Sequence, residues 1–293
     1  MKAWGVRDVS SDKAPKVFPM CRLVGIVASE PTEFALVLKE APRSLATLSR
    51  EHKDGWGIAV HDEAAHGWTI SRGTETADSD DRFHEIAAGS RGQVLVAHVR
   101  QKTVGSTRIE NTHPFARDGW VFAHNGTISE CKGLSEGASA KRLGEITGDT
   151  DSELFFAYLL TQLDRHDLLR VENEAARDAA SALLDAVTAE LRAARIGAFN
   201  FLLSNGDTCF AHRFGRSLYT LERTPTDPTR ERRILTQDTT LMTRWTSRRQ
   251  AVFIASERIT DEPWQELPDG ALVRIDRVPS PRIAFTAAPK RAA

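Results

Sequence analysis

Cysteines, long apolar runs and net charge are all scarce in this 293-residue chain, and each shortage excludes a class of protein. The three cysteines, Cys21, Cys131 and Cys209, are odd in number and widely spaced, which argues against a disulfide scaffold and for a reducing, cytoplasmic compartment. No apolar run approaches the length needed to span a bilayer. A formal net charge of -1 provides no broad surface for nucleic acid or for an anionic membrane. The sequence therefore indicates a soluble globular protein that recognises charged ligands locally.

The first twenty residues also lack the apolar segment of a secretory signal, because Lys2, Arg7 and Asp12 are among the charges that interrupt them. We expect residues 1–20 to be a leader, either a propeptide that is removed or a stretch ahead of a true start at Met20. No internal repeat or break in composition divides the rest. Residues 21–278 are predicted to form a single domain, and residues 279–293, rich in proline and small side chains, a flexible tail.

Hydrophobic patterning predicts strands toward both ends of the chain and the longer helices between them. Nearly continuous apolar residues predict a strand over 21–28 that is buried on both faces. Helical spacing predicts one helix beginning at Thr150 or Asp151 and a longer one over 171–195. The other predicted strands are 56–60, 68–71, 93–100, 120–123, 198–204, 208–214, 218–221, 251–255 and 272–275, and the other helices 33–39, 43–50 and 80–88. This order favours an α+β domain with antiparallel sheets and helices on their outer faces.

Cys21 stands at the head of the first predicted strand, directly after a methionine. If the bond before it is broken, one residue carries both a thiol nucleophile and an α-amine that titrates near neutrality and can take the thiol proton. The alternative is a structural cysteine at the start of a buried strand, because free cysteine is among the most buried residue types. The choice between the two depends on residues elsewhere in the chain.

Polar residues gather where other predicted strands and helices end. An asparagine side chain and a neighbouring glycine N–H, at Asn125 and Gly126, can stabilise the oxyanion that forms when a thiolate attacks an amide. Arg100 can bind an α-carboxylate in a bidentate manner, and Asp151 can accept hydrogen bonds from an α-ammonium group. With Cys21 and His113, these residues supply what hydrolysis of an amide on an amino-acid-like substrate requires.

The motifs that carry these residues, in this order and spacing, resemble those of the class II glutamine amidotransferases, a branch of the N-terminal-nucleophile hydrolases. They are Cys21 after a methionine, Asn111-Thr112-His113-Pro114, His124-Asn125-Gly126 and Thr150-Asp151-Ser152-Glu153. The resemblance extends to about residue 276, through Ala255-Ser256-Glu257, Trp264 and Leu267-Pro268-Asp269-Gly270, which are similar to the C-terminal part of stand-alone members.

The resemblance implies a four-layer αββα sandwich, a set of roles and no cofactor or metal. Cys21 is then the nucleophile and its amine the base, Asn125 and Gly126 form the oxyanion hole, and Arg100 and Asp151 hold the glutamine head group. His113 is expected to line or support the substrate pocket. The implied partners are glutamine or a γ-glutamyl small molecule and, where ammonia is passed on, a separate synthase subunit.

Two segments distinguish this chain from family members that are fused to a synthase. Those members carry Arg-Trp-Ala-Thr where this chain has Arg100-Gln101-Lys102-Thr103, so Thr103 keeps its place as a substrate-binding candidate while the tryptophan is missing. Asp54-Gly55-Trp56-Gly57 resembles stand-alone members, some of which hydrolyse γ-glutamyl peptides or ergothioneine precursors. The same segment also fits a plain turn in which Trp56 anchors the core.

Each site residue also has a structural interpretation. Arg100 fits a surface ion pair, Asn125-Gly126 fits a hairpin turn, and Asp151 fits a helix N-cap. His98, His113 and His124 raise a zinc hydrolase as a rival, although the chain has no His-Glu-x-x-His motif and no close histidine pair. A non-catalytic glutamine or γ-glutamyl sensor is the rival from another class. The leading hypothesis is a cytoplasmic hydrolase that releases glutamate through a γ-glutamyl thioester, while the leaving group and the oligomeric state are left open.

Overall fold

The computed structural model describes residues 21–64, 67–102, 105–227, 232–236, 239–242 and 249–286. Three expectations fall wholly or partly outside these residues: the leader over 1–20, the substrate contact of Thr103, and the end of the tail. Within the described ranges, no helix has both the length and the apolar character needed to cross a membrane.

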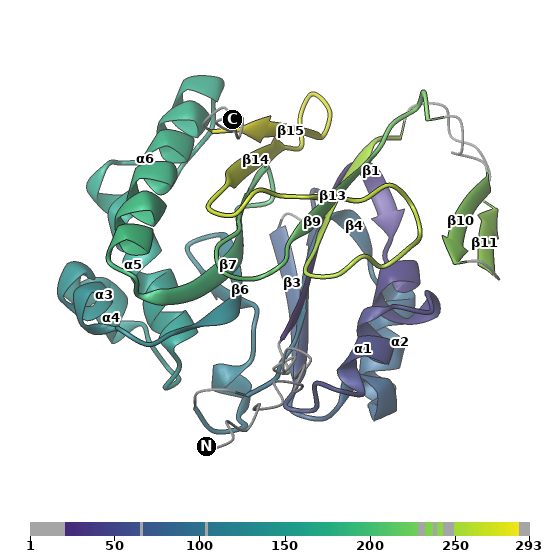
Figure 1. Cartoon of the computed structure of the whole chain (residues 1–293), viewed down its shortest axis with the longest axis horizontal. Helices are drawn as coiled ribbons and strands as arrows, with labels where there is room; N and C mark the ends of the chain where they lie inside the picture. The colour runs from purple at the N-terminus through teal and green to yellow at the C-terminus, as the bar shows by residue number, and fades with distance from the viewer. Residues whose placement is uncertain are drawn as a thin grey trace, which may run out of the picture.

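Two antiparallel β-sheets lie face to face in the middle of the molecule (Figure 1). The seven-stranded sheet has the order β13 (Gln265–Glu266), β9 (Tyr219–Arg223), β12 (Ala251–Ala255), β1 (Arg22–Glu33), β4 (Arg91–Val99), β2 (Trp56–Asp62) and β3 (Gly67–Gly73). The six-stranded sheet has the order β15 (Arg282–Phe285), β14 (Leu272–Asp276), β8 (Thr208–His212), β7 (Gly197–Ser204), β6 (Trp120–Ile128) and β5 (Phe115–Arg117). A separate pair consists of β10 (Arg232–Thr236) and β11 (Thr239–Met242).

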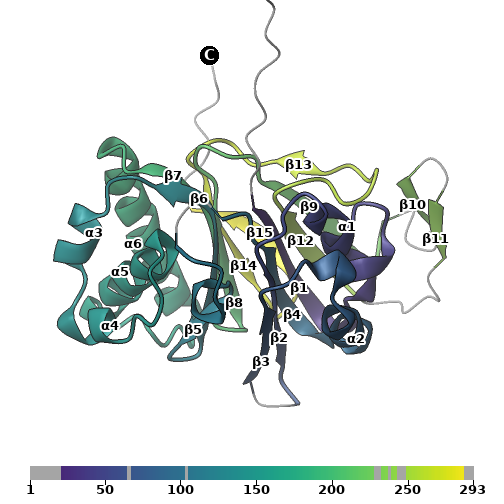
Figure 2. The ribbon, with the colours of Figure 1, turned by 90° about the horizontal axis from the view of Figure 1, so that it is seen from below.

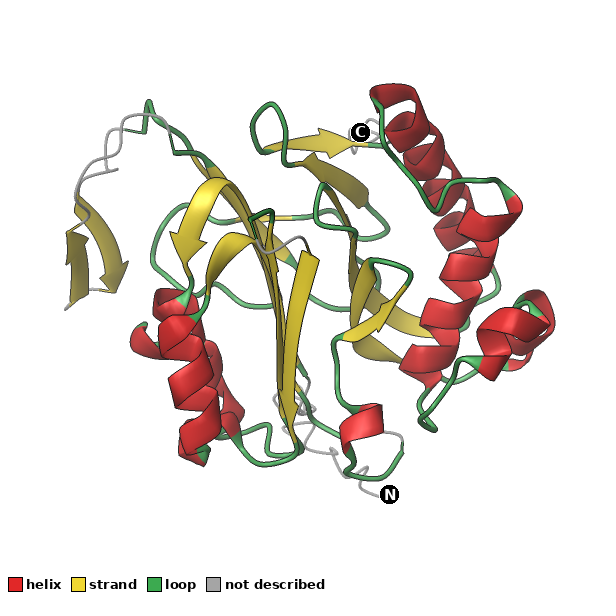
Figure 3. Cartoon of the chain, turned by 180° about the vertical axis from the view of Figure 1, so that it is seen from behind, coloured by secondary structure: helices red, strands yellow, loops and turns green. Residues whose placement is uncertain are grey.

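Helices cover the outer face of each sheet, as Figures 2 and 3 show from two directions. The seven-stranded sheet is covered by α1 (Leu45–Ser49), α2 (Asp81–Gly89) and the short π-helix η1 (Leu36–Glu40). The six-stranded sheet is covered by α5 (Asp151–Arg165) and α6 (Glu174–Ala193), with α3 (Lys132–Gly137) and α4 (Ala140–Gly144) beside them. Two 3-10 turns, η2 (Ala77–Ser79) and η3 (Ile109–Asn111), lie in loops. The expected four-layer αββα sandwich is confirmed.

Side-chain alternation along the central strands divides the core into three apolar layers. In β1, Leu23 and Val27 point between the sheets, while Val24 and Ile26 point toward α1 and α2. In β6, Val121 and Ala123 point between the sheets and Phe122 points toward α5. The same parity decides which polar residues at the strand ends reach the layer between the sheets.

Most predicted strands form, and the differences have local causes. The predicted strand over 120–123 extends to Ile128, because Asn125 and Gly126 pair with β7 and do not form a turn. Asp80, predicted as the first residue of the helix over 80–88, is instead the N-cap of α2 and accepts a hydrogen bond from the N–H of Arg82. Within the stretch expected to be a flexible tail, β15 pairs with β14 and continues the sheet as far as Phe285.

Candidate active site

The predicted nucleophile, Cys21, directly precedes the central strand β1, which is held on both sides by antiparallel neighbours. The first residues of the strand are fixed by β4 and by the end of β12. The N–H of Leu23 donates to Ser256 Oγ at 3.0 Å, and the N–H of Ser256 donates to the Leu23 carbonyl at 3.0 Å. Strand pairing therefore determines where the cysteine side chain is presented.

The Cys21 sulfur contacts the backbone of Gln101 on the loop after β4. The N–H of Gln101 donates to Sγ at 3.2 Å, and the thiol donates to the Gln101 carbonyl at 3.3 Å. Burial raises the pKa of the Cys21 thiol, whereas the Gln101 N–H and the charge of Arg100 act to lower it. A backbone donor and a cation beside the sulfur are the groups that stabilise a thiolate.

Arg100 is buried, with 3% of its surface exposed, so the alternative that placed it at the protein surface is wrong. Its N–H donates to the Gly55 carbonyl at 2.8 Å, and its guanidinium donates to the Ser106 carbonyl at 3.1 Å. Burial lowers the pKa of Arg100, and the nearby Cys21 and carboxylates, Asp54, Asp149 and Asp151, oppose that effect. A buried guanidinium stays protonated and is well suited to bind a carboxylate.

Asn125 and Gly126 lie within β6, in the part of the strand next to α5. By alternation from Val121 and Ala123, the Asn125 side chain points between the sheets, where β6 contacts β1 and β4. Within the part of the chain that the structure describes, the Asn125 amide has no hydrogen-bond partner. A Cβ atom at Gly126 would collide with the carbonyl oxygen of Ala198, so glycine is required there by close packing.

Asp151 is the first residue of α5, and the N-cap of that helix is Thr150, whose hydroxyl accepts from the N–H of Glu153 at 3.2 Å. Asp151 Oδ2 accepts the N–H of Ile128 at 2.7 Å, which joins the helix to the end of β6. The interpretation of Asp151 as the cap is therefore wrong, and its carboxylate lies beside the strand that carries Asn125.

The three histidines occupy different environments. Buried histidines with hydrogen-bond partners were the structural alternative for His98 and His124, and only His124 fits it: it points toward α5, where Nδ1 lies 2.8 Å from Ser152 Oγ. His98 and His113 stack with their ring centroids 4.4 Å apart, and none of their ring nitrogens has a hydrogen-bond partner among the described residues. Burial holds the pKa of His113 well below its ordinary value. No group of side chains in the described ranges is arranged to hold a metal ion.

Two residues that position this site were not predicted from the sequence. Gln101 acts through its backbone, which has no side-chain signature. Asp54 receives the N–H of Lys102 on Oδ2 at 2.8 Å, and its own N–H donates to the Arg100 carbonyl at 3.1 Å. The turn that contains Asp54 could have drawn attention to it, since Trp56 in the same turn is fully buried, as expected for a core anchor, and donates to Asp80 at 2.7 Å.

Comparisons with known proteins agree with this geometry. The family model for class-II glutamine amidotransferases matches residues 20–286. A protein of Haemophilus influenzae, provisionally named a glutamine amidotransferase, is 32% identical over 211 residues, which cover 70% of this chain and 67% of that protein. The gamma-glutamyl-hercynylcysteine sulfoxide hydrolase of Mycobacterium tuberculosis is 27% identical over 268 residues, which cover 87% of this chain and 93% of the relative.

Solved structures show the same fold. The crystal structure of a predicted glutamine amidotransferase from Pseudomonas aeruginosa superposes with a TM-score of 0.60 at 24% identity, covering 88% of this chain and 98% of the other. The phosphoribosylpyrophosphate amidotransferase of Bacillus subtilis superposes with a TM-score of 0.54 at 17% identity, over 91% of this chain and 49% of that one. The chain therefore belongs to the class-II glutamine amidotransferases.

Proposed function

We propose that this chain hydrolyses the γ-amide bond of glutamine or of a γ-glutamyl compound, with Cys21 as the nucleophile. The observation that carries the proposal is the setting of the sulfur: a backbone N–H donor 3.2 Å away at Gln101 and the buried cation of Arg100 beside it. The unpaired amide of Asn125 points into the same layer between the sheets. A nucleophile, an oxyanion donor and a carboxylate-binding arginine together fit acyl transfer from an amino-acid-like substrate.

The chemistry proceeds in two balanced steps. The α-amine of Cys21 takes the thiol proton, the thiolate forms a C–S bond to the γ-carbonyl carbon, and the carbonyl electrons move onto oxygen. The Asn125 amide and the Gly126 N–H stabilise that oxyanion while the protonated amine delivers its proton to the departing nitrogen and the C–N bond breaks. The amine then deprotonates water, which attacks the thioester; the C–S bond breaks, glutamate leaves and the thiol is restored.

This mechanism needs a free amine on Cys21, so we propose that residues 1–20 are absent from the active form. A peptide nitrogen is not basic, and a chain that retains the leader would have no base at this position. The family model supports the proposal, because its match begins at residue 20, directly before the cysteine.

Substrate binding is assigned to two charged groups that lie close enough to affect one another, Arg100 and Asp151. Arg100 binds the α-carboxylate and Asp151 the α-ammonium group of the glutamyl moiety. His113, whose ring contacts that of His98, is proposed to support the pocket, and Thr103 is proposed as a further contact with substrate. These assignments follow the motif positions of the family and the electrostatic proximity of Asp151 to Arg100.

The nature of the leaving group separates two forms of this activity. Ammonia would serve a separate synthase subunit, whereas an amine or peptide would place the enzyme in thiol or peptide metabolism. The relative named gamma-glutamyl-hercynylcysteine sulfoxide hydrolase favours the second form, since the similarity covers 87% of this chain and 93% of that protein. The three free cysteines fit a reducing, cytoplasmic location for either form.

The test is a screen of the mature protein against glutamine, glutathione and other γ-glutamyl amides, with glutamate as the readout. Intact-mass analysis first identifies the N-terminal residue. We expect Cys21 at the N-terminus and a Cys21→Ala variant whose turnover is lower by about 10⁴-fold or more, because the nucleophile is lost.

The matched control is Cys131→Ser, which alters another partly exposed thiol that takes no part in the mechanism. It should retain wild-type turnover. Equal turnover in Cys21→Ala and the wild type would refute the mechanism. A folded protein that keeps Met1, binds glutamine and releases no glutamate would be the sensor instead.

A further inference from the structure

We infer that Glu153 is a positioning residue that sets the affinity of the site for the substrate's α-ammonium group. It does so by fixing the short segment 147–149 that leads into Asp151. The inference rests on the proposed function, in which Asp151 binds that ammonium group, and it adds a determinant two residues away that has no contact with the substrate.

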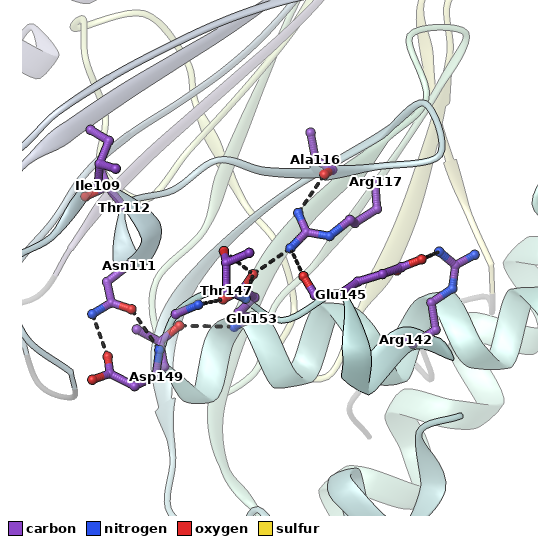
Figure 4. Close-up of polar contacts among 12 residues, drawn as sticks. Ile109, Asn111, Thr112, Ala116, Arg117, Arg142, Glu145, Thr147, Asp149 and Glu153 are labelled. Atoms are coloured by element: carbon purple, nitrogen blue, oxygen red, sulfur yellow. Dashed lines mark hydrogen bonds and ion pairs between the residues drawn. The ribbon is translucent and has the colours of Figure 1, made fainter. Parts of the chain in front are cut away.

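The Glu153 carboxylate accepts four hydrogen bonds, and three of them come from the segment 147–149 (Figure 4). Oε1 accepts the N–H and the hydroxyl of Thr147 at 3.1 and 3.2 Å, and Oε2 accepts the N–H of Gly148 at 2.7 Å. Arg117 donates to Oε1 at 2.6 Å and balances the charge of a side chain that is only 2% exposed. A buried carboxylate with four donors is a rigid anchor.

The same segment is held from the opposite side by Asn111. The N–H of Asp149 donates to Asn111 Oδ1 at 2.9 Å, and Asn111 Nδ2 donates to Asp149 Oδ1 at 2.5 Å. A Cβ atom on Gly148 would collide with Asn111 Oδ1, so the segment passes too close for any other residue. Residues 147–149 are therefore fixed between two buried side chains directly before α5.

This network also reaches the arginine that is proposed to bind the α-carboxylate. The Ser106 carbonyl accepts both the Arg100 guanidinium, at 3.1 Å, and Asn111 Nδ2, at 2.9 Å. A chain of hydrogen bonds thus runs from Arg100 through Ser106 and Asn111 to the segment that Glu153 anchors. The two charged groups that bind the amino-acid head are linked by one set of contacts, which fixes their separation.

The surroundings of Glu153 exclude a ligand site as the reason for this cluster. The cavity between Arg117, Arg142, Glu145 and Glu153 has a volume of about 10 Å³, which is room for one water molecule at most. Positioning of the neighbouring segment is the role that the contacts support.

The test compares Glu153→Gln with Glu145→Gln. Both remove one carboxylate from the same cluster, but the Glu145 carboxylate contacts Arg142 and does not touch residues 147–149. For Glu153→Gln we expect KM for the γ-glutamyl substrate to rise about 10–100-fold, as for loss of charged hydrogen bonds, with kcat within about 3-fold of wild type. Glu145→Gln should leave both constants unchanged.

The inhibition constants of two competitive inhibitors provide a second measurement. Their ratio would not change if Glu153 only stabilised the fold. The inhibition constant of glutamate, which has the α-ammonium group, should rise with KM in Glu153→Gln. That of glutarate, which lacks the group, should stay within about 2-fold of wild type. If Glu153→Gln does not fold, Thr147→Val removes only the hydroxyl contact to Oε1 and should raise KM about 2–5-fold.

The outcomes separate the two proposals. A wild-type protein that releases no glutamate from any γ-glutamyl amide overturns the proposed function and this inference with it. An active wild type beside a Glu153→Gln variant with unchanged KM, or with equal losses of affinity for glutamate and glutarate, overturns this inference alone.

Discussion

On the seven-stranded sheet the strand that follows Cys21 is held by backbone pairing, whereas on the other side of the site the segment 147–149 before Asp151 is held by the buried side chains of Glu153 and Asn111. The nucleophile side uses main-chain contacts to Gln101 and Val99, together with the Ser256 hydroxyl and a hydrogen bond of 3.4 Å from the Arg22 guanidinium to the Cys21 carbonyl. The head-group side uses the carboxylate of Glu153 with its arginine partner. The two sides therefore depend on different parts of the sequence.

This difference predicts how each side responds to change. Main-chain hydrogen bonds between paired strands persist through most side-chain substitutions, so the position of the sulfur is robust. A buried carboxylate loses much of its function when one oxygen is replaced by nitrogen, since the donors that bonded to that oxygen are left without a partner. Substitutions should therefore alter substrate affinity on the head-group side more readily than they displace the nucleophile.

After loss of Cys21 itself, the largest expected effect comes from removing the proposed oxyanion donor, the Asn125 amide. Asn125→Ala should lower kcat by about 10²–10³-fold, because the amide stabilises charge that develops only in the transition state. KM should change little, and the melting temperature should stay close to wild type, since the Asn125 amide has no partner to lose among the described residues. Steady-state kinetics and a thermal melt measure the two quantities.

Asn205→Ala is the matched control for this variant. Asn205 lies in the turn between β7 and β8 and accepts the N–H of Asp207 at 3.1 Å, so the same substitution there should cost stability and leave kcat unchanged. If Asn125→Ala lowers kcat by tenfold or less, the Asn125 amide is not the group that stabilises the oxyanion.

The fold and most candidate residues could be predicted because they follow local rules. Alternation predicted the central strands, and the Thr150 side chain caps α5 as a capping pattern predicts. Asn125-Gly126 is the counterexample, since its local preference is for a hairpin turn. Tertiary pairing with β7 overrides that preference, and no short-range signal reports it.

The contacts that position the site could not be predicted, because they join segments far apart in sequence through atoms common to all residues. Gln101 holds the sulfur with its backbone, eighty positions from Cys21. Asn111 meets Asp149 only after two loops have been brought together by the sheets. Motif spacing identifies which side chains take part, but the register of the strands decides which of them meet.

An effect of intermediate size is expected on protein stability when the pH is lowered. It comes from His98, which lies on β4 and faces the six-stranded sheet. Burial lowers the pKa of His98 to about 3, so the folded protein keeps the ring neutral while the unfolded chain binds a proton near pH 6.5. Its contribution is fully present above pH 6.5 and is lost as pH falls toward 3. Between pH 7 and pH 5, His98 should reduce the free energy of unfolding by about 2 kcal/mol.

Urea unfolding of the wild type and of His98→Gln at both pH values measures this contribution. Glutamine does not titrate in this range, so the loss of stability between pH 7 and pH 5 should be smaller in the variant by about that 2 kcal/mol. The comparison concerns the difference between the two pH values, so any destabilisation at pH 7 cancels. An identical loss in both proteins would mean that His98 is not held neutral.

The smallest effect should come from a side chain that holds the start of β1, the hydroxyl of Ser256. Ser29 provides a matched control at the other end of the same strand pair, because Gln250 N–H donates to its hydroxyl at 3.0 Å just as Leu23 N–H donates to Ser256 at 3.0 Å. Ser256→Ala should cost about 1–2 kcal/mol of stability, since it leaves the buried N–H of Leu23 without a partner. Ser29→Ala should cost less, because Ser29 is partly exposed. If strand pairing alone positions Cys21, kcat stays within about 3-fold of wild type in both variants. A tenfold fall in kcat for Ser256→Ala alone would show that this side, too, depends on a single side chain.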